Sequence, residues 1–226
     1  FWVLPFGTDD PELVREVLAA TYGMIEFVDQ EIGRVLDRLR SLGIHEDTIV
    51  VFTSDHGDMM GDHSLMLKGN LHYGGVIRVP LVIAGPGIGA GRTSSLASSL
   101  DLCPTLLDFC GVDPWRGIQG VSLRPVLEDP STSVRDHLLI EDDLPPVISE
   151  VFQAPQRMRT LVTGGERFTR DCDGAEQLFD LLDDPDELHD LAGGDGKRRG
   201  ELLAALVDAS MAVDDVGRGI GPARAG

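Results

Sequence analysis

The apolar run Thr48–Phe52 constrains this chain most, because a long helical pattern precedes it and a second apolar run follows it. Apolar residues recur at helical spacing over residues 14–39, between the capping sequence of residues 9–12 and Gly43. Residues 79–84 form the second apolar run. A helix followed by two buried strands is typical of an α/β protein. We therefore expect the helix to pack its apolar side on a sheet.

The later part of the chain has a different pattern. Short apolar segments alternate with turn residues at 137–140, 157–162 and 177–181. This pattern predicts a small antiparallel sheet with one solvent-facing side. Apolar residues on one side of 199–213 predict a helix after this sheet.

These patterns predict two domains. Residues 1–128 would form part of an α/β domain, and residues 129–213 a small α+β subdomain. The Gly-containing tail, 214–226, is expected to be flexible. Because the chain starts at Phe1 without Met, we expect it to be part of a longer protein.

Charge and composition limit the partners. The net charge is −19, from 19 Lys and Arg against 38 Asp and Glu. Nucleic acids and anionic membrane surfaces attract clustered basic residues, so we expect neither as a partner. No apolar run reaches the ~18 residues that a membrane-spanning helix needs. The three Cys residues include no CxxC pair, which argues against a zinc ribbon or a disulfide scaffold.

The loop Thr53–Lys68 concentrates chemically reactive side chains directly after the first strand. It holds three Asp, two His and one Lys within sixteen residues. Asp55 and His56 come first, where the backbone leaves the strand, and ligands collect at such strand ends in α/β sheets. A carboxylate beside an imidazole suits divalent cations from Mg²⁺ and Ca²⁺ to Mn²⁺ or Zn²⁺. The alternative is an ordinary polar turn, because Asp-x-Gly is common turn chemistry.

Lys68 and His72 are the other candidate site residues. Lys68 follows the apolar residues 65–67, so its ammonium group could lie in a partly dry pocket and bind an oxyanion. The alternative is a surface Lys whose alkyl stem covers apolar surface. His72 offers a further hydrogen-bond donor beside the tight backbone of Gly74 and Gly75.

Several segments resemble one known family in the same order along the chain. The chain resembles the sulfatase family of the alkaline-phosphatase-like superfamily over roughly residues 10–210. The segments that carry this resemblance are Tyr22–Asp29, Asp55–Gly57, Lys68–Gly69, Tyr73–Pro80, Ala84–Gly87, Leu100–Asp108 and Gln177–Glu187.

The resemblance implies an alkaline-phosphatase-like sheet covered by helices and a site with assigned roles. Asp55 and His56 would be metal ligands of a catalytic divalent cation, Ca²⁺ in most sulfatases, with Mn²⁺ or Mg²⁺ as alternatives. Lys68 would bind a sulfate oxygen and help neutralise the leaving group, and His72 is a second candidate catalytic residue. The substrate would be a small-molecule or saccharide sulfate ester.

The family's nucleophile is a formylglycine made from a Cys/Ser-x-Pro-x-Arg motif, and no such motif occurs in this chain. Cys103 is followed by Pro104 but lacks that spacing and falls in a helical pattern, so we expect it to be buried. The family's paired N-terminal Asp ligands are also absent. We therefore expect the nucleophile and these ligands upstream of this chain.

Two departures from the family pattern leave the substrate class open. Many sulfatases have Asp-Asn where this chain has Asp55 and His56, and the Asp-His form also occurs in phosphonate monoester hydrolases and phosphodiesterases. Gly74 replaces the family's usual Glu. The alternatives to a sulfatase are therefore a phosphoryl-transfer relative or a non-catalytic chain with this fold.

Overall fold

The computed structural model describes residues 6–7, 9–194 and 196–217. The chain divides into two units, Phe1–Ala90 and Gly91–Gly226, earlier than the expected domain boundary at 128/129. Within the second unit, Asp101 forms an ion pair with Arg135 across 128/129. The mixture of helices and sheets confirms the predicted α/β class.

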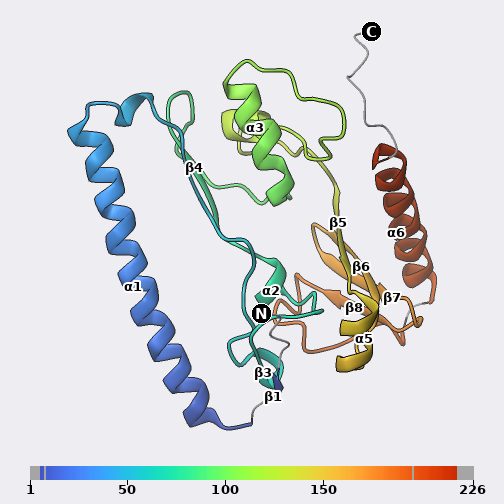
Figure 1. Ribbon diagram of the computed structural model, residues 1–226. Coiled ribbons are helices and arrows are strands. Elements are labelled where there is room, and N and C mark those ends of the chain that lie inside the picture. Colours follow the sequence, from blue (N-terminus) through green and yellow to red (C-terminus); the bar gives the residue numbers. More distant parts are fainter. Residues whose placement is uncertain (1–5, 8, 195, 218–226) are drawn as a thin grey trace. The chain divides into compact units, whose positions relative to one another are not determined.

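The first unit consists of one long helix and short strands joined by loops (Figure 1). Its elements are β1 (Phe6–Gly7), α1 (Pro11–Ser41), η1 (His45–Asp47), β2 (Val50–Thr53), η2 (Asp62–Ser64), β3 (Leu65–Met66), α2 (Gly74–Ile77) and β4 (Leu81–Ala84), where η denotes a 3₁₀ helix.

Local sequence signals determine both ends of α1. At the start, Asp10 Oδ1 accepts the N–H groups of Glu12 and Leu13 at 3.0 and 3.3 Å. Pro11 occupies the first helical turn, where no N–H group is needed. At the other end, Gly43 adopts a φ of 70°, which glycine tolerates without strain. The predicted helix is confirmed.

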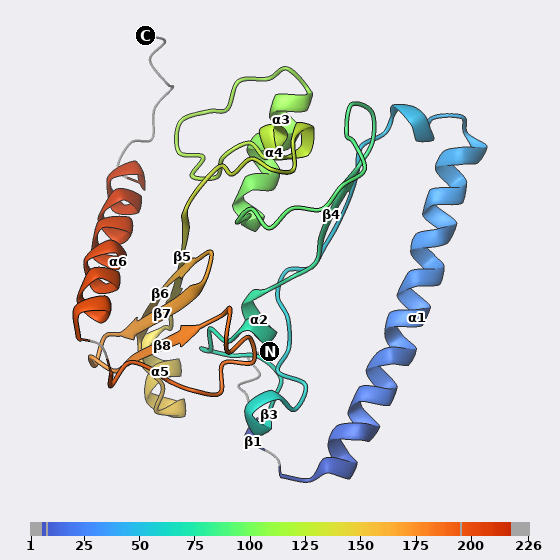
Figure 2. The same cartoon turned by 180° about the vertical axis from the view of Figure 1, so that it is seen from behind.

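The expected packing of α1 on a sheet is not found among the described residues. No residue of α1 is buried, and Figures 1 and 2 show the helix apart from the ribbon of β2 and β4. Six large apolar residues of α1 each have more than half of their own surface exposed, namely Tyr22, Met24, Ile25, Phe27, Val28 and Val35. Strands β2 and β4 have four residues each, so their ribbon is too short to cover a helix of 31 residues. No described helix has both the length and the hydropathy needed to cross a membrane.

Strands β2 and β4 determine where the polar loop starts and finishes. They pair antiparallel, from Val50 opposite Ala84 to Thr53 opposite Leu81. The chain between Thr53 and Leu81 therefore leaves and returns at the same end of the ribbon. This segment also holds every buried residue described in the first unit, namely Met59, Met66, Asn70, His72 and Val76.

The second unit contains a helical part followed by a four-stranded sheet with a long helix (Figure 2). Its elements are η3 (Ser99–Asp101), α3 (Leu102–Phe109), α4 (Arg124–Glu128), β5 (His137–Asp143), α5 (Pro146–Phe152), β6 (Arg157–Thr163), β7 (Glu166–Asp171), β8 (Glu176–Asp180) and α6 (Gly196–Gly217).

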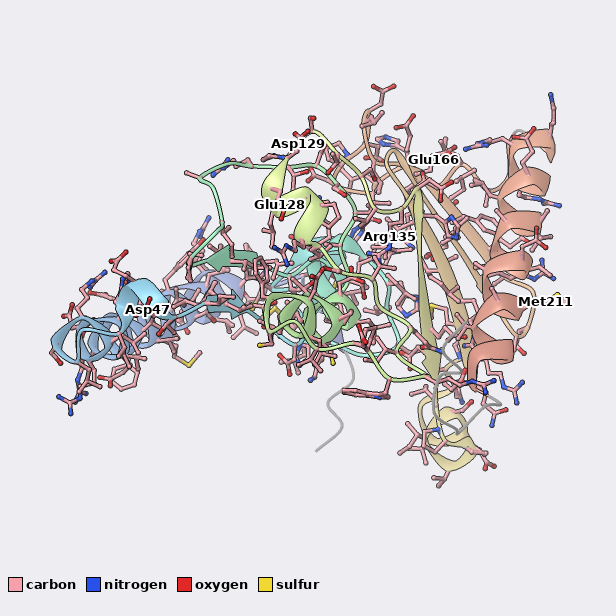
Figure 3. All side chains as sticks on the ribbon, turned by 90° about the horizontal axis from the view of Figure 1, so that it is seen from above. Asp47, Glu128, Asp129, Arg135, Glu166 and Met211 are labelled. Atoms are coloured by element: carbon pink, nitrogen blue, oxygen red, sulfur yellow. The ribbon has the colours of Figure 1, made fainter. Side chains whose placement is uncertain are left out.

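The predicted antiparallel sheet is confirmed, with the strand order β5-β6-β7-β8. Helix α6 packs on it through a buried apolar cluster of Leu161, Phe168, Leu178, Leu202 and Leu206. At the edge of this contact, Arg198 of α6 donates to Glu166 of β7, which Figure 3 labels. The helix continues to Gly217, beyond the expected end at 213, and 218–226 lies outside the described residues.

Asp101 joins three segments of the second unit. Its carboxylate is fully buried and accepts N–H groups from Ser98 and Val121 at 2.7 and 2.9 Å. Both terminal nitrogens of the Arg135 guanidinium, labelled in Figure 3, donate to it as well. A charge that is buried away from water needs such hydrogen bonds and an opposite charge.

Nearby on α3, Cys103 is exposed, which corrects the expectation that it is buried.

Arg135→Ala should lower the free energy of unfolding by about 3 kcal/mol, because Asp101 would stay buried without its counter-ion. Urea denaturation of the chain measures this loss. Lys197→Ala is the control, since its 4.0 Å pair with Glu201 is exposed and its loss should cost less than about 0.5 kcal/mol. A loss equally small for both variants would contradict the assignment.

Candidate active site at the end of strand β2

A close backbone contact holds the start of the polar loop. The Gly57 N–H donates to the Val76 carbonyl at 2.8 Å. An ideal Cβ on Gly57 would lie 1.9 Å from the carbonyl oxygen of Gly75. Real Cβ atoms do not approach an oxygen so closely, so only glycine permits this contact. The contact fixes the backbone immediately after Asp55 and His56.

The loop then folds back on itself as a small hairpin. The Met59 N–H donates to the Leu67 carbonyl at 2.9 Å, and the Gly61 N–H donates to the Leu65 carbonyl at 2.8 Å. The buried Met59 and Met66 side chains give this hairpin an apolar interior. The fold-back carries Lys68 toward the position where the loop began.

Three predicted site residues come together at this point. Asp55 Oδ2 lies 3.3 Å from His56 Nε2, and Lys68 Nζ contacts the same imidazole nitrogen. The Asp55 carboxylate is exposed, while His56 and Lys68 are partly buried. A carboxylate, an imidazole and an ammonium group therefore converge just beyond the end of β2.

Hydrogen bonding determines which imidazole nitrogen of His56 is available. Nδ1 lies 2.8 Å from the carbonyl oxygen of Gly57. A carbonyl can only accept, so Nδ1 carries a proton, and in the neutral imidazole Nε2 then carries the lone pair. Such a second hydrogen bond is the usual support of a metal-binding histidine.

The Asp55 carboxylate is kept ionised. The backbone N–H of His56 donates to Asp55 Oδ1 at 3.0 Å, and this bond is the main cause that lowers the pKa of Asp55. Burial of the carboxylate is the next largest effect and raises this pKa, and the electrostatic interactions with His56 and Lys68 lower it. Asp55 is therefore available as an anionic ligand at neutral pH.

The donor set fits part of a divalent-cation site. Two acceptors, Asp55 Oδ2 and His56 Nε2, lie close enough for one cation to contact both. Lys68 Nζ contacts Nε2 in this structure, so the ammonium group would have to move aside for a cation to bind there. Divalent cations take four to eight ligands in proteins. Among the described residues, no group of three or more His, Cys, Asp or Glu side chains could hold a metal. The two residues can thus be some of the ligands but not the complete set.

His72 differs from the other candidates in its burial, because only 6% of its surface is exposed.

The structure also shows a contact that the sequence did not reveal. The rings of His63 and Tyr73 stack with centroids 4.1 Å apart. These residues are ten positions apart in a loop without regular periodicity, so no sequence pattern marks the pair.

Comparison with known proteins identifies the family. A model described as Sulfatase matches residues 5–112, and one described as N-sulphoglucosamine sulphohydrolase, C-terminal, matches residues 61–209. The chain belongs to the sulfatase family. A choline-sulfatase from Rhizobium meliloti is 36% identical to this sulfatase chain over 186 residues, which are 80% of the chain and 34% of the relative.

Solved structures agree with this family and with its fold. One is a protein in complex with its substrate D-glucosamine-2-N,6-O-disulfate, with 30% identity, a TM-score of 0.74 and coverage of 84% of this chain and 40% of that one. Another is a phosphonate monoester hydrolase of Agrobacterium radiobacter, with 29% identity, a TM-score of 0.74 and coverage of 89% and 42%. The sulfatase chain therefore spans well under half the length of the proteins it resembles.

Gly57→Ala should open the base of the loop, because the new methyl group would collide with the Gly75 carbonyl. We expect a local loss of about 1–3 kcal/mol, seen as faster amide hydrogen exchange in residues 57–68. Gly23→Ala is the matched control, since an added Cβ there meets no atom within 4 Å. In α1 it should stabilise the helix by about 0.5–1 kcal/mol and leave the loop unchanged. Unaltered exchange in Gly57→Ala would refute the close contact.

Proposed function

We propose that the full-length protein is a sulfuric ester hydrolase whose active site includes Asp55, His56 and Lys68. One observation supports this most strongly, namely the convergence of these three side chains at the end of β2. Membership of the sulfatase family supports the same reaction class.

Each of the three residues has a distinct task in this proposal. Asp55 and His56 Nε2 are two ligands of a divalent cation, and His56 is held in the required tautomer by the Gly57 carbonyl. When bound, the cation supplies Lewis acidity and orients the sulfate group. Lys68 places a positive charge where the sulfate oxygens and the leaving oxygen become more negative. Such preorganised charge lowers the barrier because it needs no rearrangement during the reaction.

The identity of the cation is a separate part of the proposal. We propose Ca²⁺, with Mn²⁺ and Mg²⁺ as the alternatives. The Asp55 carboxylate oxygen suits all three ions. Ca²⁺ comes first because most sulfatases use it, and the imidazole of His56 leaves room for Mn²⁺. The nucleophile that the family implies, a formylglycine, would lie upstream of this chain.

The substrate is proposed to be a sulfate ester of a saccharide or of another small molecule. The relatives offer both kinds. One similar structure holds glucosamine disulfate as its substrate, and one similar sequence is a choline-sulfatase. A net charge of −19 disfavours large polyanionic partners such as nucleic acids.

A phosphonate monoester hydrolase is the second candidate. Its support is the similarity to the enzyme of Agrobacterium radiobacter, together with the pairing of Asp55 with His56. Both reactions place negative charge on non-bridging oxygens, so Lys68 and the cation would serve either one. Substrate preference therefore has to be measured.

The full-length protein should release sulfate from an aryl sulfate faster than it hydrolyses an aryl phosphonate monoester or a phosphodiester.

Asp55→Ala should lower turnover at least roughly a thousandfold and reduce the bound metal, measured by elemental analysis. Lys68→Ala should lower turnover by a factor of about 10²–10³ while the metal content stays unchanged.

The 226-residue chain alone should be inactive, because catalytic groups that act as a unit fail together.

The outcomes separate the hypotheses. Faster hydrolysis of the phosphonate would establish the second candidate instead. Full turnover and full metal content in Asp55→Ala would remove Asp55 from the site. Lys197→Ala is the control for nonspecific effects of removing a positive charge. Lys197 lies in α6, and its side chain is exposed.

A further inference from the structure

The hairpin that carries Lys68 has a strained backbone. Four non-glycine residues within it have positive φ angles, namely Met60 at 48°, His63 at 54°, Ser64 at 59° and Leu67 at 69°. Left-handed conformations are unfavourable for residues that carry a side chain and persist only where the surroundings hold them. The hairpin therefore depends on restraints from the surrounding chain.

The carboxylate of Asp58 provides such a restraint. Its Oδ1 accepts the N–H of Met60 at 2.9 Å and the N–H of Leu67 at 3.0 Å. Met60 and Leu67 are the first and the last of the four strained residues. Because a single oxygen receives both bonds, Asp58 closes the hairpin across its base. The Asp58 side chain is partly buried, where a hydrogen bond is stronger than it is in water.

We infer that Asp58 is a positioning residue for Lys68. Leu67 immediately precedes Lys68, so the φ angle of Leu67 sets the direction in which the next side chain leaves the loop. Without the bond from its N–H to Asp58, Leu67 can relax to negative φ. Lys68 Nζ would then leave its place beside His56 Nε2.

This role has a specific chemical requirement. Asp58 needs one accepting oxygen at the Oδ1 position, since both N–H groups bind there. It does not need a negative charge. Asparagine keeps that oxygen, whereas alanine removes it, so the two substitutions separate a backbone clamp from a residue that acts through its charge.

Hydrogen exchange of the full-length protein, followed by mass spectrometry of peptides from residues 59–68, tests the clamp directly. Asp58→Ala should speed exchange roughly tenfold or more, because two partly buried N–H groups lose their acceptor. Asp58→Asn should stay within about threefold of the wild type. Asp62→Ala, which removes an exposed carboxylate from the same hairpin, is the matched control and should leave exchange unchanged. Equal rates in Asp58→Ala and the wild type would overturn the inference.

Turnover gives a second readout that rests on the proposed function. With an aryl sulfate, kcat of Asp58→Ala should fall roughly tenfold, and Asp58→Asn should restore it to within about threefold of the wild type. Loss of turnover in Asp58→Asn with normal exchange would show that the charge acts, and would overturn the inference. A wild-type protein that hydrolyses no sulfate ester would refute the proposed function, while the exchange rates would still decide the role of Asp58.

Discussion

The backbone contact between Gly57 and the turn at Gly75 and Val76 is the constraint on which the first unit depends. The N–H of Gly57 donates to the Val76 carbonyl at 2.8 Å. A side chain on Gly57 would collide with the carbonyl oxygen of Gly75. This contact fixes Asp55 and His56 on one side and starts the hairpin on the other. The geometry of the candidate site thus follows from backbone packing within one loop.

That loop is ordered by its own interior, whereas the neighbouring regular elements expose their apolar faces. The buried residues described in the first unit lie between Met59 and Val76. In contrast, α1 buries none of its residues, and Phe52 and Val82 on the ribbon remain exposed. Helix α1 nevertheless contacts the loop through Val14, whose side chain lies against Gly61. The proposed ligands and nucleophile outside this chain would complete the site.

Local rules predicted the elements well, but they could not predict how the loop folds back. Pro11 and Gly43 mark the ends of α1 because capping depends on adjacent residues alone. The approach of Lys68 to His56 depends on a left-handed Leu67, and no propensity favours that conformation for leucine. Strand β7 was missed for a related reason, since a charged residue, Arg167, is buried there against Glu187. In both cases the conformation depends on contacts between residues that are distant in the sequence, which local patterns do not predict.

An anomalous difference map from crystals of the full-length protein would test the central claim most directly. The account predicts one divalent-cation peak at about 2.3–2.6 Å from an Asp55 carboxylate oxygen, with His56 Nε2 as a second ligand and Lys68 Nζ on the side open to a bound sulfate. A cation bound entirely by other residues, with Asp55 and His56 facing solvent, would contradict it.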